Sequence, residues 1–97
     1  MQVEWLQESL EKAAGICQYL EEFSYQAADN FRDRLDKTIQ NIVRMPTTGM
    51  PSKKKEGIRS MKIDKNRRIY YVFDEAAARI VLVDIFDTRQ HPAKNQY

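Results

Sequence analysis

The order of apolar and polar residues predicts one short strand, two helices and then three strands. Met1, Val3 and Trp5 alternate with polar residues, which is typical of a short strand with one buried side. After Trp5 the apolar spacing changes from two residues to three or four, the period of an amphipathic helix. We therefore expect the strand to end there and to join one edge of a sheet.

Two amphipathic helices are predicted between residues 6 and 45. The apolar stripe of the first consists of Leu10, Ala13, Ile16, Cys17, Leu20 and Phe23. The stripe of the second consists of Ala28, Phe31, Leu35, Ile39 and Ile42. Ser24 can cap the second helix, and Pro46 ends it near Met45. The short connection predicts an antiparallel helical hairpin, with Cys17 as a buried structural thiol.

The second half of the chain has the character of a sheet. Residues 45–57 hold two prolines, two glycines and three consecutive lysines without any period, so we predict a loop. Three stretches rich in β-branched and aromatic residues follow, at 58–63, 67–73 and 79–86, and predict consecutive antiparallel strands. The apolar run 80–83 predicts a central strand buried on both faces. The polar tail 87–97 shows no period, and Tyr97 has no core to join.

These elements predict an α+β fold. An N-terminal strand precedes an α-helical hairpin, which packs on a mainly antiparallel sheet with three consecutive C-terminal strands. A chain of 97 residues closes one core, so residues 1–97 are expected to form a single domain. A single cysteine, no N-terminal signal pattern and no apolar run long enough to span a bilayer lead us to expect a cytoplasmic protein without a membrane partner.

Charge is segregated along the chain. Residues 1–43 carry four basic and eight acidic side chains, a net charge of −4, whereas residues 44–73 carry nine basic and two acidic side chains, a net charge of +7. Such a basic segment indicates a polyanionic partner, either a nucleic acid or an acidic protein surface. The alternative is a basic face that is merely solvated.

Few kinds of chemistry are open to this composition. One histidine and one cysteine cannot supply an ordinary four-ligand zinc site, and three scattered glycines make no phosphate loop, so we predict neither a metal nor a cofactor. Arginines held on strands suit phosphate or carboxylate oxygens. His91 as a base, or Asp87, beside such arginines can help an RNA 2′-hydroxyl attack its own phosphate. The alternative is ordinary pairing of Asp87 and Arg89 with other strand ends, with Arg67 as a solvated hairpin charge.

Aromatic residues leave a similar choice open. Tyr70, Tyr71 and Phe73 alternate along one strand and suit either core packing or the stacking of bases. One of the two tyrosines is expected to face inward. Tyr97 becomes a candidate stacking or phenolic group only if the tail folds back.

Five motifs occur in a distinctive order. They are A-x-x-F-x-x-x-L from Ala28, M-P-x-x-G from Met45, G-I-R from Gly57, R-R-I-Y-Y from Arg67 and I-F-D-T-R-Q-H-P from Ile85. With these motifs the chain resembles the RelE/ParE superfamily of toxins from bacterial type II toxin–antitoxin modules, often described as plasmid stabilisation proteins. The resemblance implies a small sheet partly wrapped by two helices and a cognate acidic antitoxin as partner.

The resemblance also implies one of two activities. RelE-like members cut messenger RNA on the ribosome, whereas ParE-like members inhibit DNA gyrase and catalyse nothing. Arg59, Arg68 and Arg89 look similar in position to three basic residues of the ribonuclease branch, and with His91 they are the catalytic candidates if the chain is a ribonuclease. Met61 departs from that branch, which has a lysine there, and no tyrosine is clearly placed beyond Arg89.

The ending Arg89, Gln90 and Pro92 is closer to ParE-like members. We therefore expect a growth-inhibiting toxin that inhibits DNA gyrase and is neutralised by its antitoxin. The alternatives are a RelE-like ribosome-dependent endoribonuclease and an inactive module that only binds its antitoxin. The residues expected to contact the target or a nucleic acid are Lys53, Lys54, Lys55, Lys62, Arg67 and Gln90.

Overall fold

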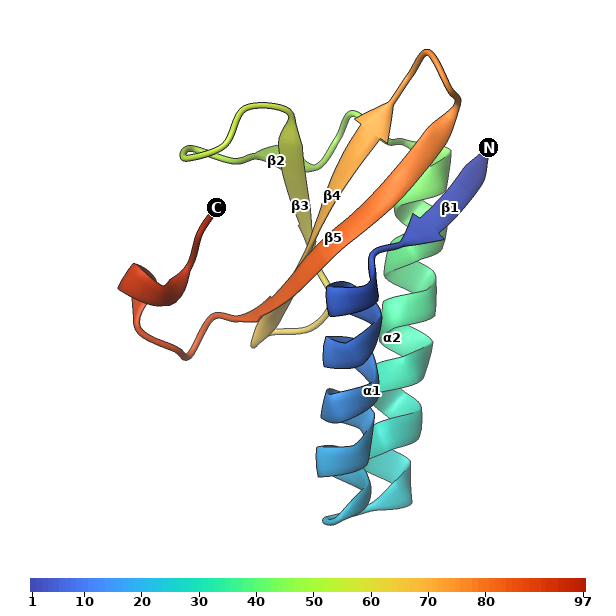
Figure 1. Ribbon diagram of the computed structural model, residues 1–97. Coiled ribbons are helices and arrows are strands. Elements are labelled where there is room, and N and C mark those ends of the chain that lie inside the picture. Colours follow the sequence, from blue (N-terminus) through green and yellow to red (C-terminus); the bar gives the residue numbers. More distant parts are fainter.

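The computed structural model describes residues 1–97, with two helices beside a five-stranded sheet (Figure 1). In chain order the elements are β1 (Gln2–Trp5), α1 (Gln7–Glu21), α2 (Tyr25–Arg44), β2 (Met50–Pro51), β3 (Ile58–Lys62), β4 (Arg67–Asp74), β5 (Arg79–Asp87) and the 3₁₀ helix η1 (Pro92–Lys94). The predicted α+β class, the helical hairpin and the three C-terminal strands are confirmed.

The sheet has the strand order β1-β5-β4-β3-β2. Strands β3, β4 and β5 are antiparallel neighbours, while β1 runs parallel to β5, from Gln2 beside Arg79 to Trp5 beside Leu82. The chain from β1 to β5 runs through the helical hairpin and strands β2, β3 and β4, so it is long enough for a parallel pair. As predicted, β1 is an edge strand and β5 lies inside the sheet.

Strand β2 lies within the segment that we predicted to be only a loop. Met50 and Pro51 pair with β3 because the preceding residues are held on Tyr71. The Tyr71 hydroxyl donates to the Pro46 carbonyl at 2.7 Å and accepts from the Gly49 amide at 3.1 Å. A Cβ atom at Gly49 would overlap that hydroxyl, so the M-P-x-x-G pattern permits a close approach that larger residues do not.

The core lies between the helices and one face of the sheet. It consists of Ala13, Phe31, Leu35, Ile42, Ile63, Ile69, Tyr71, Ile80, Leu82 and Ile85. Most of the predicted stripe of α2 is therefore buried, and Tyr71 is the tyrosine that faces inward. On β5, Ile80 and Leu82 are buried but Val81 and Val83 only partly, so the prediction that this strand is buried on both faces is wrong.

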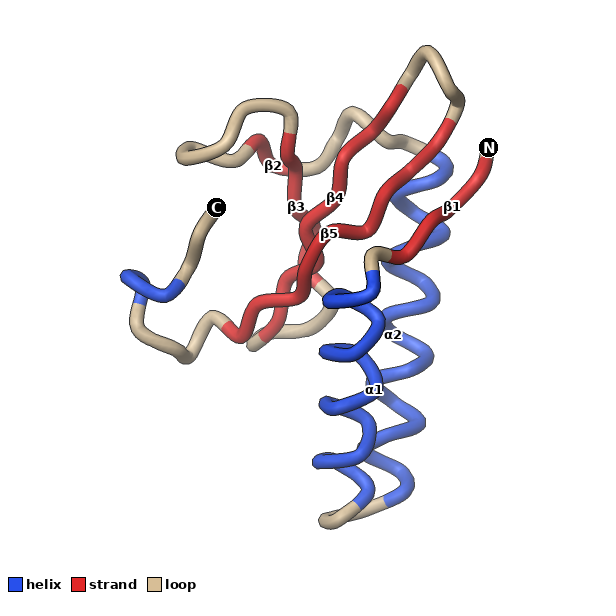
Figure 2. The backbone as a smooth tube through the Cα atoms, in the orientation of Figure 1, coloured by secondary structure: helices blue, strands red, loops and turns tan.

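The stripe of α1 is less buried than predicted. Leu10 and Phe23 are 48% and 70% exposed, and Cys17 is only half-buried. The hairpin extends well beyond the sheet, so the last turn of α1 has no strand beneath it (Figure 2). Ser9 takes a buried place instead, where its single hydroxyl proton has two acceptors within reach, the carbonyls of Leu6 and Leu82, each 2.8 Å from the oxygen.

The opposite face of the sheet, here called the open face, carries no helix. Alternation places Ser60, Lys62, Arg68 and Tyr70 on this face. Between Tyr70 and Tyr71 the pairing with β5 shifts by one residue, which leaves Val83 without a partner and sets Asp84 opposite Tyr70. The C-terminal tail, residues 88–97, folds back over the open face. Neither helix combines the length and apolar character needed to cross a membrane.

Candidate target-binding surfaces

The open face holds a basic cavity of about 350 Å³. Its lining consists of Met50, Pro51, Ser52, Lys53, Lys54, Ser60, Arg68, Tyr70, Pro92, Asn95 and Tyr97, and contains neither aspartate nor glutamate. We refer to it as the open-face cavity. Three cations therefore line a concave surface without a carboxylate, which is the composition expected of an anion site.

Arg68 is held in place by a neutral partner. Its Nε donates to the hydroxyl of Ser60 at 3.0 Å, and Ser60 is 4% exposed. Neither Arg68 nor Lys53 takes part in any of the seven ion pairs of the molecule. The remaining N–H groups of the guanidinium keep their capacity for an outside oxyanion. Alternation along β3 places Ser60 on the same side as Lys62, so the sequence contained a signal for this serine.

The tail closes one side of the open-face cavity. The rings of Tyr97 and Tyr70 stack with centroids 4.6 Å apart, so the condition for a stacking role of Tyr97 is met. Asn95 donates from Nδ2 to the Tyr70 hydroxyl at 3.1 Å, and Lys54 donates to the Asn95 carbonyl at 2.6 Å. The Ser52 hydroxyl donates to the Tyr97 carbonyl. Burial, together with the nearby negative charges of Asp84 and Glu8, raises the pKa of Tyr97 to about 12.

A second cavity, of about 460 Å³, lies between α1 and the end of β5. We call it the helix-side groove, and it is lined by Lys12, Gly15, Ile16, Tyr19, Arg67, Ile85, Phe86, Asp87, Arg89 and Gln90. Lys12 pairs with the buried carboxylate of Asp84 at 2.5 Å. Arg89 donates to Asp87 from Nε at 3.0 Å and from Nη2 at 2.6 Å. The hydrogen bond from Arg89 holds the pKa of Asp87 below its usual value.

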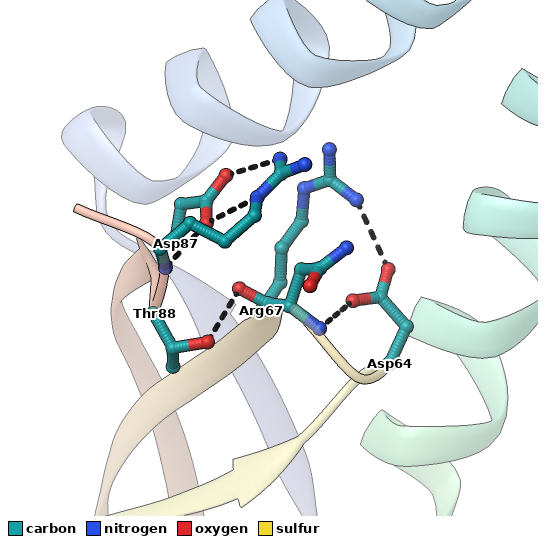
Figure 3. A network of polar contacts seen from close by, with 6 residues as sticks. Asp64, Arg67, Asp87 and Thr88 are labelled. Atoms are coloured by element: carbon teal, nitrogen blue, oxygen red, sulfur yellow. Dashed lines mark hydrogen bonds and ion pairs between the residues drawn. The ribbon is translucent and has the colours of Figure 1, made fainter.

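Arg67 is part of a polar network that joins the β3–β4 turn to the end of β5 (Figure 3). Its guanidinium donates to Asp64 at 3.1 Å and lies over the ring of Phe31, 5.4 Å from its centroid. The amide of Thr88 donates to the Asn66 carbonyl at 2.7 Å. Arg67 is only 9% exposed. Together with the pairs of Lys12 and Arg89, its pair with Asp64 means that every cation lining the helix-side groove already has a carboxylate partner.

Arg59 has a place of its own. It lies on the helix-side face of β3, opposite Tyr71, and its Nη1 donates to the Gly49 carbonyl at 2.9 Å. Lys62 lies on the other face, opposite Arg68, as the alternation predicts. Arg59 therefore helps to hold the segment that carries β2, and it lines neither the open-face cavity nor the helix-side groove.

His91 also stands apart from the arginines. It caps η1, where its Nδ1 accepts from the Ala93 amide at 3.1 Å, and it lines neither cavity. The four residues considered for catalysis thus occupy separate places. Arg59 lies on β3 beside β2, Arg68 in the open-face cavity, Arg89 in the helix-side groove and His91 at the start of η1. No three His, Cys, Asp or Glu side chains lie together in a way that would hold a metal ion.

Comparison with known proteins agrees with this fold. Residues 3–92 match the model of a family described as the ParE toxin of the type II toxin–antitoxin system parDE. A solved structure titled YoeB/ParE toxin from Agrobacterium tumefaciens is 20% identical, with a TM-score of 0.68 over 90% of this chain and 98% of that one, a likeness of fold. No curated protein sequence matches. The resemblance to RelE/ParE toxins is confirmed, and the chain belongs to the ParE toxin family of type II toxin–antitoxin systems.

Proposed function

We propose that this toxin binds and inhibits DNA gyrase, and that its cognate antitoxin neutralises it. Family membership implies an antitoxin partner. The observation that favours binding over catalysis is the separation of Arg59, Arg68, Arg89 and His91 into four places. General acid–base catalysis needs a base within hydrogen-bond reach of the reacting proton, beside the groups that stabilise the transition state. A binding surface needs only complementary charge and shape.

The exposed lysines are the residues we assign to target contact. Lys53, Lys54 and Lys55 follow β2, and Lys62 is exposed beside Arg68 on the open face. Gln90 lies at the helix-side groove, while Arg67 serves by holding the strand ends together. Exposed cations of this kind accelerate association with an acidic surface. Their positions support a partner that approaches the open face.

Supercoiling by purified gyrase tests the proposal. The unmodified toxin is expected to inhibit, and the double variant Lys53→Gln/Lys55→Gln to need about ten times more protein for the same effect, because two exposed charge pairs together contribute about 1.4 kcal/mol, a factor of about ten. The control is Lys37→Gln/Lys65→Gln, which removes two exposed lysines elsewhere and is expected to inhibit normally. Supercoiling that is untouched at saturating toxin would refute gyrase as the target.

A ribosome-dependent endoribonuclease is the second candidate. It is favoured by the open-face cavity, where Arg68 and two lysines without carboxylate partners stand beside the stacked Tyr70 and Tyr97. This function predicts message cleavage in a translation extract, abolished by Arg68→Ala or Arg89→Ala with little change in thermal stability. Normal cleavage by both variants would contradict the mechanism, and intact messages together with inhibited supercoiling would favour gyrase.

A further inference from the structure

The tail makes contacts of the kind that a separate ligand would make. It presents two carbonyl oxygens to donors of the loop after β2, that of Asn95 to Lys54 and that of Tyr97 to Ser52. It also lays the ring of Tyr97 on Tyr70, with the ammonium of Lys55 5.0 Å from the ring centroid. The open-face cavity is thus occupied at one side by the chain's own oxygen acceptors and one aromatic ring.

This docking is weakly held. Residues 88–94 are exposed. From residue 89 to residue 94 the hydrogen bonds of the tail go only to nearby residues in the sequence. Hydrogen bonds that face water contribute little net free energy, while each ordered residue costs backbone entropy. The tail is therefore close to balance between docked and undocked states, and a ligand that prefers one state can shift it.

The cationic donors of the cavity have only neutral acceptors as partners. Lys54 is satisfied by a neutral carbonyl, and Arg68 by the neutral hydroxyl of Ser60. An anionic oxygen is a stronger partner for both, because it adds attraction between opposite charges to a hydrogen bond whose donor is already charged.

We propose that the open-face cavity binds an oxyanion, a phosphate or a carboxylate group, and that residues 92–97 compete with it as an internal occupant. The docked tail holds the ammonium of Lys54 on the Asn95 carbonyl, and its release frees this donor for the anion, while Lys53 is exposed with the tail in place. The site is assigned from Arg68, Lys53 and Lys54, and it does not depend on gyrase being the cellular target.

Pyrophosphate is a suitable probe, because it carries oxyanions but no ring that would itself stack on Tyr70. Its affinity for the full chain is measured by calorimetry with Tyr97→Ala, Arg68→Gln and a control, Tyr25→Ala, which removes an aromatic ring that is 77% exposed on the helical hairpin. Tyr97→Ala is expected to bind about five-fold tighter than the unmodified chain, because the apparent affinity scales with the open fraction. Arg68→Gln is expected to bind about ten-fold weaker, and Tyr25→Ala unchanged.

Each result bears on the proposal. Equal affinity of the unmodified chain and Tyr97→Ala overturns the competition, and affinity that survives both Arg68→Gln and Lys53→Gln overturns the site. Pyrophosphate is also expected to speed exchange of the Tyr97 amide, which donates to Oδ1 of Asn95 at 2.9 Å in the docked tail. Parallel titration with citrate separates the sources, because tighter binding of pyrophosphate indicates a phosphate ligand and tighter binding of citrate a carboxylate ligand. None of these measurements involves gyrase, so either proposal can fail alone.

Discussion

The open-face cavity and the helix-side groove both hold three cations, yet they differ in what those cations can do. In the groove, Lys12, Arg67 and Arg89 are each paired with a carboxylate. The lining of the cavity contains no acidic residue. The contrast teaches that a count of basic residues does not locate an anion site, because nearby carboxylates decide which cations remain available.

The difference follows from the elements that form each region. Strand β5 supplies Asp84 and Asp87 as the partners of Lys12 and Arg89, and the β3–β4 turn supplies Asp64 as the partner of Arg67, although only Asp87 lines the groove itself. The loop after β2 carries three consecutive lysines, with Glu56 as its one acidic residue. The aspartates of β5 thus neutralise cations near α1, whereas the loop after β2 keeps a net positive charge.

The largest expected effect concerns the support of the open-face cavity. Gly49→Ala places a Cβ atom on the fully buried Tyr71 and is expected to destabilise the fold by about 2 to 3 kcal/mol, the usual cost of overpacking. For a chain of this size that corresponds to a fall in Tm of roughly 10 °C. Thermal unfolding followed by circular dichroism measures it, with Gly15→Ala as the control because a Cβ atom there meets nothing. Equal melting of both variants would contradict the close contact.

A smaller loss of stability is expected when an ion pair of a groove-lining cation is removed. Lys12→Met leaves the carboxylate of Asp84, which is 3% exposed, without its cation. Because the lysine itself is partly exposed, we expect about 1 to 2 kcal/mol, less than for a fully buried pair. Lys37→Met removes an exposed lysine without an ion pair and serves as the control in denaturant titration. An unchanged midpoint for Lys12→Met would show that Asp84 does not need Lys12.

The docked tail has an expected signature at alkaline pH. Tyr97 has a pKa of about 12 when docked, against 10.0 ordinarily, so docking is strongest well below pH 10 and weakens as the phenol ionises. By linkage the docking constant falls about ten-fold by pH 11. The difference in phenolate absorbance between the unmodified chain and Tyr97→Phe isolates this group. A midpoint near 10.0 would contradict docking, and pyrophosphate is expected to move the midpoint toward that value.

The smallest expected effect comes from a substitution that leaves one cation of the helix-side groove without its carboxylate, as in the open-face cavity. Asp87→Asn leaves Arg89 without its carboxylate, and we expect pyrophosphate to bind in the groove with an affinity a few-fold above that of the unmodified groove, because exposed pairs contribute less than about 1 kcal/mol. Nuclear magnetic resonance shifts around Arg89 report this binding apart from that at Arg68. Absence of any change at Arg89 would show that neutralisation is not what separates the two regions.

Much of the fold follows from the sequence because its determinants are local. The period of Ala28, Phe31 and Leu35, the capping hydroxyl of Ser24 and the β-branched runs indicate helices and strands directly. Alternation also places Arg59 and Lys62 on opposite faces correctly. Asp87 and Arg89, in contrast, pair with each other and not with other strand ends, the alternative that we drew from the sequence.

The remaining features depend on contacts between distant residues. The exposure of Phe23, the pairing of β2, and the stacking of Tyr97 on Tyr70 each follow from how far one element reaches over another. Sequence periodicity alone therefore determined which side chains share a face, since that follows from backbone geometry. Only the tertiary structure decided that Lys12 neutralises Asp84, because the two lie 72 residues apart and meet only when α1 packs against β5.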